Sequence, residues 1–245
     1  MEIGFSQPVE LEWLNAAADW TAAGYPPEEI RRRLDELLAT RIAVGTTSKK
    51  SSRYKRISIL MTIWVTPRRE LVDFRDHASK LLEPGSSRIA LHYAMLTATY
   101  PFFWSVASQV GRMLRLQDEI SMTQVKRRCK EVLGERDTVA YAATRVVKTL
   151  VDLGLLKRGQ KIGNYAAPDR SITTEIAAVG VLLEAGMLAE KKRTTLLEGI
   201  ITTPALFPFH IPTSRELARQ QFSRLSISGG EHGGERVTLS ELRPE

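Results

Sequence analysis

The sequence predicts a mainly α-helical protein that contains a small β-hairpin. Apolar residues recur every three or four positions along most of the chain, which is the period of a half-buried helix. Serine, proline and glycine stand where those stretches begin or end. Residues 155–166 instead form two short extended stretches around a basic turn. We expect an N-terminal helical domain at 1–99, a second domain at 100–168 and C-terminal helices at 169–245.

Composition allows a nucleic-acid partner without requiring one. The 245 residues include 35 Lys and Arg against 28 Asp and Glu, a formal net charge of +7. This excess suits a polyanion, although many basic proteins bind none. The single cysteine, Cys129, excludes an intramolecular disulfide and a cysteine-based zinc cluster, and its place on an apolar helix face predicts a buried thiol. No leader or membrane span is predicted, so we expect a cytoplasmic protein.

Four helices are expected in the N-terminal domain. Pro8 to Thr21 forms the first, and Pro26-Pro27 with two following glutamates starts the second. Arg68 to Leu82 and Arg88 to Thr99 form the others, the last capped by Ser86 or Ser87.

A basic segment at 44–56 interrupts these helices. It contains no acidic residue, and two interpretations remain open: a solvated loop, or a flexible arm that reaches phosphate groups. The cations of the arm are Lys49, Lys50, Arg53, Lys55 and Arg56.

Three helices and a hairpin are expected between residues 100 and 168. The first helix begins at Pro101, and its apolar positions include Phe103, Val106 and Val110. Ser121 and Gln124 have the spacing of a capping box at the start of the second helix. That helix presents Lys126, Arg127 and Lys130, and Gly134 is placed to end it.

The third helix has the features of a DNA-recognition helix. Asp137 is its expected N-cap, and the buried side includes Val139, Ala143, Val146, Val147 and Leu150. The opposite side carries Tyr141, Thr144, Arg145 and Lys148. Gly154 ends the helix, and a hairpin with Lys157, Arg158 and Lys161 follows. This order of elements is typical of a winged helix-turn-helix with a β-hairpin wing.

The pattern predicts duplex DNA as the partner. Arg145 can pair with a guanine edge, Tyr141 and Thr144 can contact a base or a phosphate, and Lys148 suits a phosphate. With only two cations on the recognition helix, we expect limited sequence specificity.

The C-terminal third is predicted to pack on the body. A helix from Asp169 or Ser171 to Leu188 is apolar around most of its circumference, as in a helix buried between other elements. The basic run 191–193 follows its end, and Thr213 or Ser214 caps a short helix. Two stretches at 225–227 and 237–239 either form a hairpin or belong to a flexible tail.

No catalytic motif is present. The sequence has no Walker A loop, no strand-linked GxGxxG, no HExxH and no GxSxG, and its four histidines are scattered. We therefore expect a non-enzymatic protein without a cofactor or metal.

One stretch resembles a known family. The runs LHYAMLTATYPFFWSVASQVGRMLRLQ, VKRRCKEVLGERDTV and RVVKTLVDLGLL, between Leu91 and Leu156, resemble the BrxA-type accessory proteins of BREX bacteriophage-defence systems. The resemblance implies a helical, DNA-binding accessory protein that is not an enzyme. The alternative is a scaffold whose winged helix docks a larger protein of a defence complex. The oligomeric state stays open.

Overall fold

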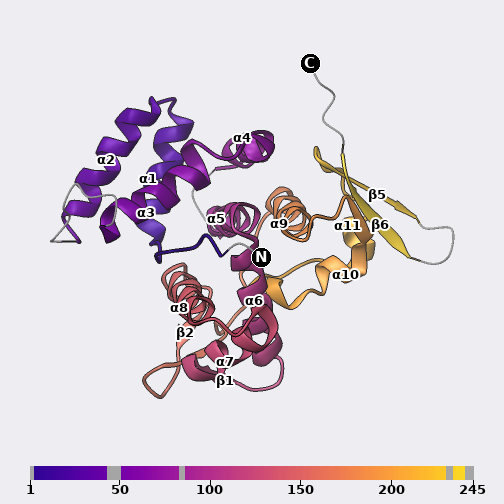
Figure 1. The fold of residues 1–245 in the computed structure, drawn as a ribbon. Coiled ribbons are helices and arrows are strands. Elements are labelled where there is room, and N and C mark those ends of the chain that lie inside the picture. The colour runs from indigo at the N-terminus through magenta and orange to yellow at the C-terminus, as the bar shows by residue number, and fades with distance from the viewer. Residues whose placement is uncertain (1–2, 43–50, 83–85, 230–233, 241–245) are drawn as a thin grey trace.

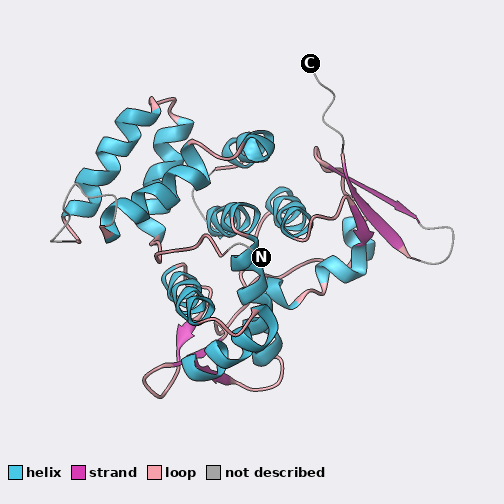
Figure 2. Ribbon diagram, viewed as in Figure 1, coloured by secondary structure: helices cyan, strands magenta, loops and turns pink. Residues whose placement is uncertain are grey.

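The computed structural model describes residues 3–42, 51–82, 86–229 and 234–240. The chain is mainly helical, as predicted, and two small three-stranded sheets lie at opposite sides of a central group of helices (Figures 1 and 2). Within the described ranges, no helix is long and apolar enough to cross a bilayer.

The N-terminal helices pack around two buried tryptophans, Trp13 and Trp64. The elements are α1 (Leu11–Ala22), α2 (Pro27–Ala39), α3 (Ser52–Leu60) with its π-helical continuation η1 (Met61–Val65), η2 (Arg69–Leu71) and α4 (Val72–Lys80). Proline stands at the first turn of α2, followed by Glu28 and Glu29, as the sequence predicted.

The structure corrects the prediction of a loop or flexible arm at 44–56 for residues 51–56, the part of this segment that it describes. The hydroxyl of Ser51 accepts the backbone N–H of Tyr54, and α3 starts at Ser52, so the second half of the segment is helical. Within it, Arg53 pairs with Asp35 at 2.8 Å, and the guanidinium carbon of Arg56 lies 5.9 Å from the ring centroid of Trp13. Lys49 and Lys50 lie outside the described residues.

Three helices form the centre of the molecule: α5 (Ser86–Thr99), α6 (Pro101–Leu114) and α9 (Ile176–Ala189). As expected from its composition, α9 is buried over most of its circumference. The predicted capping role of Ser87 differs from the observed one, because its hydroxyl accepts the backbone N–H of Glu175 at the start of α9. His92 is a core residue, with Trp64 Nε1 donating to its Nδ1 at 3.1 Å.

The first sheet belongs to a unit made of α6, β1 (Glu119–Ser121), α7 (Met122–Leu133), α8 (Asp137–Asp152), β2 (Lys157–Arg158) and β3 (Asn164–Ala166). The strands are antiparallel in the order β1-β3-β2, and Tyr165 pairs with both Ile120 and Arg158. The capping box of Ser121 and Gln124 is confirmed. Asp137 is not the N-cap of α8; it is the first helical residue, and its carboxylate pairs with Lys130.

The second sheet belongs to a unit with the same order of elements. It comprises α9, β4 (Thr194–Leu196), α10 (Leu197–Ile201), η3 (Pro204–Leu206), α11 (Ser214–Leu217), β5 (Leu225–Gly229) and β6 (Glu235–Leu239). Its strand order is β4-β6-β5, which corresponds to that of the first sheet. A constant offset of 75 residues relates α6 to α9, β1 to β4 and the start of α7 to that of α10. The chain therefore contains an internal structural repeat.

The two units differ in their third helix and in their hairpin. The third helix has 16 residues in the first unit and 4 in the second. The strands β5 and β6 pair over five residues each, so the stretches at 225–227 and 237–239 form the hairpin and not a flexible tail.

Candidate nucleic-acid interface

The exposed edge of α8 is the first component of the candidate interface. The apolar side of the helix is buried as predicted, including Val139, Val146 and Leu150. Tyr141 is 63% exposed, and Lys148, two turns further along, is also exposed. Residues seven apart lie on the same helix face, so these two side chains share one edge of α8.

Thr144 and Arg145 are less available than the sequence suggested. The hydroxyl of Thr144 donates to the carbonyl oxygen of Ala140 at 3.0 Å, so its hydrogen is used within the helix. Arg145 is half-buried and close enough to Arg56 of α3 for the two charges to interact. Burial lowers the pKa of Arg56, Arg145 lowers it further, and Glu10 opposes the shift. The N-terminal helices therefore add a cation beside α8.

Acidic neighbours largely neutralise the predicted cations of α7. Lys130 lies 3.2 Å from Asp137 and 3.8 Å from Glu135, and Arg127 lies 3.7 Å from Glu131. Lys126 is half-buried. The helix predicted to present these three cations is thus a weaker basic surface than its sequence indicates.

The hairpin β2–β3 is held in shape by Glu119 of β1. The carboxylate accepts the backbone N–H of Gln160 at 2.8 Å and the side-chain amide of Asn164 at 3.0 Å. These two hydrogen bonds lower the pKa of Glu119, and Lys161 and Lys157 add to the effect. A Cβ on Gly159 would lie 2.7 Å from the Glu119 carboxylate, so the turn requires glycine here.

The hairpin presents two free cations and one exposed apolar residue. Lys157 pairs with Asp169, whereas Arg158 and Lys161 are exposed and form no ion pair within the described ranges. Ile162 beside them is fully exposed, with a relative accessibility of 107%. Sequence periodicity did not indicate Ile162, because one apolar residue in a short turn carries no pattern.

A groove connects α8 with the hairpin. It encloses about 350 Å³ between the N-terminal segment, the end of α8 and the strands β2 and β3. Lys148 and Arg158 line it together with two carboxylates, Glu10 and Asp152. Burial is the main cause that raises the pKa of both carboxyl groups. Asp152 further raises the pKa of Glu10, and Glu12 further raises the pKa of Asp152. The groove therefore carries both signs of charge.

The N-terminal segment is fastened to α8 by two hydrogen bonds that the sequence did not reveal. The backbone N–H of Val9 donates to Thr149 Oγ1 at 3.1 Å, and that of Leu11 donates to Asp152 Oδ2 at 2.6 Å. These contacts span about 140 positions of the chain, beyond the range of any local pattern. They hold the N-terminal segment against the C-terminal half of α8, beside Lys148.

The structure brings together part of the predicted site. Arg145, Lys148, Arg158 and Lys161 lie on α8 and the adjoining hairpin and form no ion pair within the described residues. Lys55 is exposed on α3, while Arg53 and Arg56 are engaged in the N-terminal helices. The name α8–hairpin surface is used below for five residues: Tyr141, Arg145, Lys148, Arg158 and Lys161.

Neither a metal centre nor a reactive thiol emerges from the part of the chain described. Cys129 is fully buried, and burial raises the pKa of its thiol to about 12. Within the described ranges, no group of three or more histidine, cysteine and acidic residues could hold a metal ion.

Comparison with protein-family models, curated proteins and solved structures gives no match for this chain. The resemblance to BrxA-type proteins therefore remains a prediction.

Proposed function

We propose that α6 to β3 forms a winged helix-turn-helix that binds duplex DNA and that the protein acts without catalysis. The observation that supports this most is the α8–hairpin surface, where a helix edge and a neighbouring hairpin carry four cations that form no ion pair within the described residues. A helix of this length can enter a major groove, and a basic hairpin can follow the adjacent phosphates.

The electrostatic balance favours general duplex binding with limited sequence specificity. Lys130 and Lys157 are paired with acids, and Glu10 and Asp152 lie beside Lys148 and Arg158. Four phosphate contacts would weaken binding on the order of a hundredfold between 50 and 200 mM salt. In keeping with the resemblance, we place this activity in an accessory protein of a prokaryotic phage-defence system.

A second candidate is a scaffold whose winged helix docks a larger protein of a defence complex. The exposed apolar side chains favour it, since Ile162 stands at the turn of the hairpin and Tyr141 on α8. A tyrosine or isoleucine side chain of this kind can fill an apolar pocket of a partner protein.

The test compares two double variants that remove the same charge. Fluorescence anisotropy with a labelled duplex at 50 mM salt measures the dissociation constant of the parent, of Lys148→Ala with Arg158→Ala, and of Arg215→Ala with Arg219→Ala in the second unit. The first pair should weaken binding at least tenfold and reduce the slope of log affinity against log salt by about 1.8. The second pair should change little.

Equal losses of affinity in the two double variants would show that net charge alone determines duplex binding. Absence of duplex binding at low salt would contradict the proposal. If Ile162→Ser then abolished a salt-resistant protein complex, the scaffold function would be favoured.

A further inference from the structure

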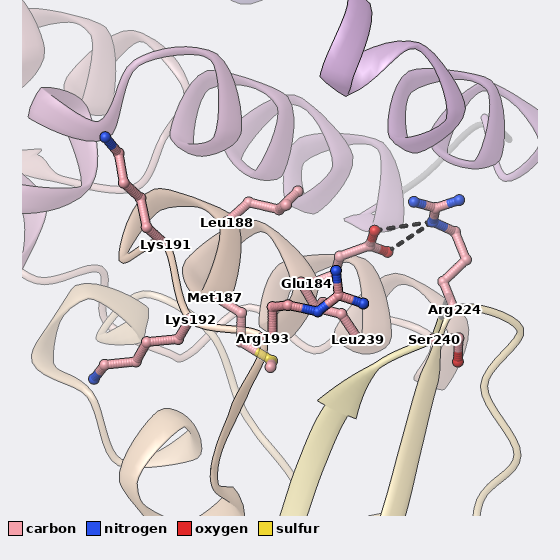
Figure 3. A pocket seen from close by; sticks show the side chains of 9 residues that line it. All are labelled: Glu184, Met187, Leu188, Lys191, Lys192, Arg193, Arg224, Leu239 and Ser240. Atoms are coloured by element: carbon pink, nitrogen blue, oxygen red, sulfur yellow. Dashed lines mark hydrogen bonds and ion pairs between the residues drawn. The ribbon is translucent and has the colours of Figure 1, made fainter. Parts of the chain in front are cut away.

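A cationic pocket lies in the second unit, away from the α8–hairpin surface. It encloses about 530 Å³ between the end of α9, the loop into β4 and the base of the β5–β6 hairpin (Figure 3). Lys191, Lys192, Arg193 and Arg224 line it, and Glu184 is its single acidic residue. Met187, Leu188 and Leu239 form an apolar part of the wall.

The ion pair at one side of the pocket orients Arg224. Its Nε donates to both carboxylate oxygens of Glu184, at 2.9 and 3.1 Å, and Glu184 is only 2% exposed. These contacts use Nε and leave the two terminal nitrogens of the guanidinium without a hydrogen bond or ion pair to the described residues. Figure 3 shows Lys191 and Lys192 on the other side of the pocket. Their ammonium groups point away from Arg224 in this view, and Arg193 lies between the two sides.

The backbone at Lys191 has a left-handed conformation that favours glycine. The N–H of Lys191 donates to Leu188 and that of Lys192 to Met187, the two bonds of a Schellman helix end. The same geometry ends α1 and α8, where the left-handed position is occupied by Gly24 and Gly154. Lys191 has a φ of 56°, and it is the one non-glycine residue with a positive φ among those described.

The cations at 191–193 have no counterpart in the first unit of the internal repeat. With the offset of 75 residues, positions 191–193 correspond to Leu116, Gln117 and Asp118 of the first unit, which include no cation. The second unit has a short third helix in place of the long one that carries Lys148 in the first unit. The cations of the two units therefore lie in different places.

We propose that this pocket binds a phosphate-bearing small molecule of nucleotide size. Lys192 also pairs with Glu190 at 2.8 Å, so the four cations face two carboxylates, and the remaining positive charge suits a phosphate group. Arginine offers a planar set of donors for phosphate oxygens. The volume lies within the range of small-molecule sites, and the apolar wall can cover the less polar part of the ligand. This site is separate from the proposed DNA interface and does not depend on it.

The test is isothermal titration of the full chain at low salt, without divalent metal, with pyrophosphate, ATP and adenosine. We expect ATP and pyrophosphate to bind at one site per chain and adenosine to bind at least tenfold more weakly. Lys191→Gly should weaken ATP binding at least fivefold while the Tm stays equal or rises, because glycine adopts this backbone without strain. Lys191→Arg should retain binding.

The control is the variant with Lys148→Ala and Arg158→Ala, which should bind ATP as the parent does. Loss of ATP binding in this control would place the ligand on the α8–hairpin surface and overturn the proposal. Absence of saturable binding by both phosphates, or unchanged binding by Lys191→Gly, would overturn it as well. Preference for a 5′-phosphorylated duplex over ATP would contradict a small-molecule ligand.

Discussion

Gly111 of α6 and Gly186 of α9 occupy equivalent positions of the internal repeat, and each unit approaches the other at that position. A Cβ on Gly111 would lie 1.9 Å from the carbonyl oxygen of Pro204 in the second unit. A Cβ on Gly186 would lie 2.9 Å from the ring of Trp104 in the first. The two units are therefore packed together through reciprocal contacts that leave no room for a side chain.

Gly111→Ala is expected to destabilise the protein strongly. The clash is with backbone, which cannot rotate away as a side chain can, so α6 and η3 must separate. We expect a loss of about 3 kcal/mol in the free energy of unfolding, measured by urea denaturation. Gly199→Ala is the matched control in α10, because its Cβ would lie 3.9 Å from the nearest atom. A similar loss in both variants would contradict the close approach.

Thr149→Val should loosen the N-terminal segment from α8. Thr149 is fully buried, and valine has a similar shape but cannot accept the Val9 N–H. An unsatisfied buried donor costs about 1–3 kcal/mol, and the Val9 amide should exchange its hydrogen faster. Urea denaturation and hydrogen exchange measure the two effects. In the control Thr144→Val, the lost hydroxyl bonds only its own helix, so a change below about 0.5 kcal/mol is expected.

Glu184→Gln should alter how stability depends on pH. Burial raises the pKa of Glu184 from 4.5 to about 7, although Arg224 lowers it. Because the folded pKa lies above the unfolded one, folding favours the protonated carboxyl, and this stabilisation is lost as pH rises from 4.5 towards 7.

The parent should therefore lose stability relative to Glu184→Gln over that interval, by on the order of 1–3 kcal/mol. Urea denaturation at pH 5 and pH 7.5 measures the difference between the two proteins. Parallel pH profiles of parent and variant would show that Glu184 does not titrate there.

Much of the helical framework could be predicted because its causes are local. The apolar face of α8, the capping box at Ser121 and the buried circumference of α9 follow from neighbours within one or two turns. The predicted cap at Asp137 was wrong, because the helix starts at Asp137 itself. Its carboxylate pairs with Lys130 of α7, a contact between two helices that a local pattern does not indicate. The strands β1 and β4 have three residues each, which is too short for an alternating pattern to indicate a strand.

The sequence did not indicate which charged side chains form ion pairs in the folded protein. Lys130, Lys157 and Arg53 belong to basic runs, yet each meets an acid contributed by a different element. Lys191 to Arg193 were predicted only as favourable charges at a helix end, whereas folding places them around one pocket with Arg224. Such groupings depend on which elements pack together.

The sequence by itself determined the mainly helical class, the capping box that starts α7 and the buried thiol of Cys129, because local periodicity and capping set them. Only the tertiary structure decided that the first and second units repeat one order of elements and pack closely at Gly111 and Gly186. It also decided which of the described cations form ion pairs. The physical reason is distance along the chain: contacts between residues 75 or more positions apart leave no local pattern in the sequence.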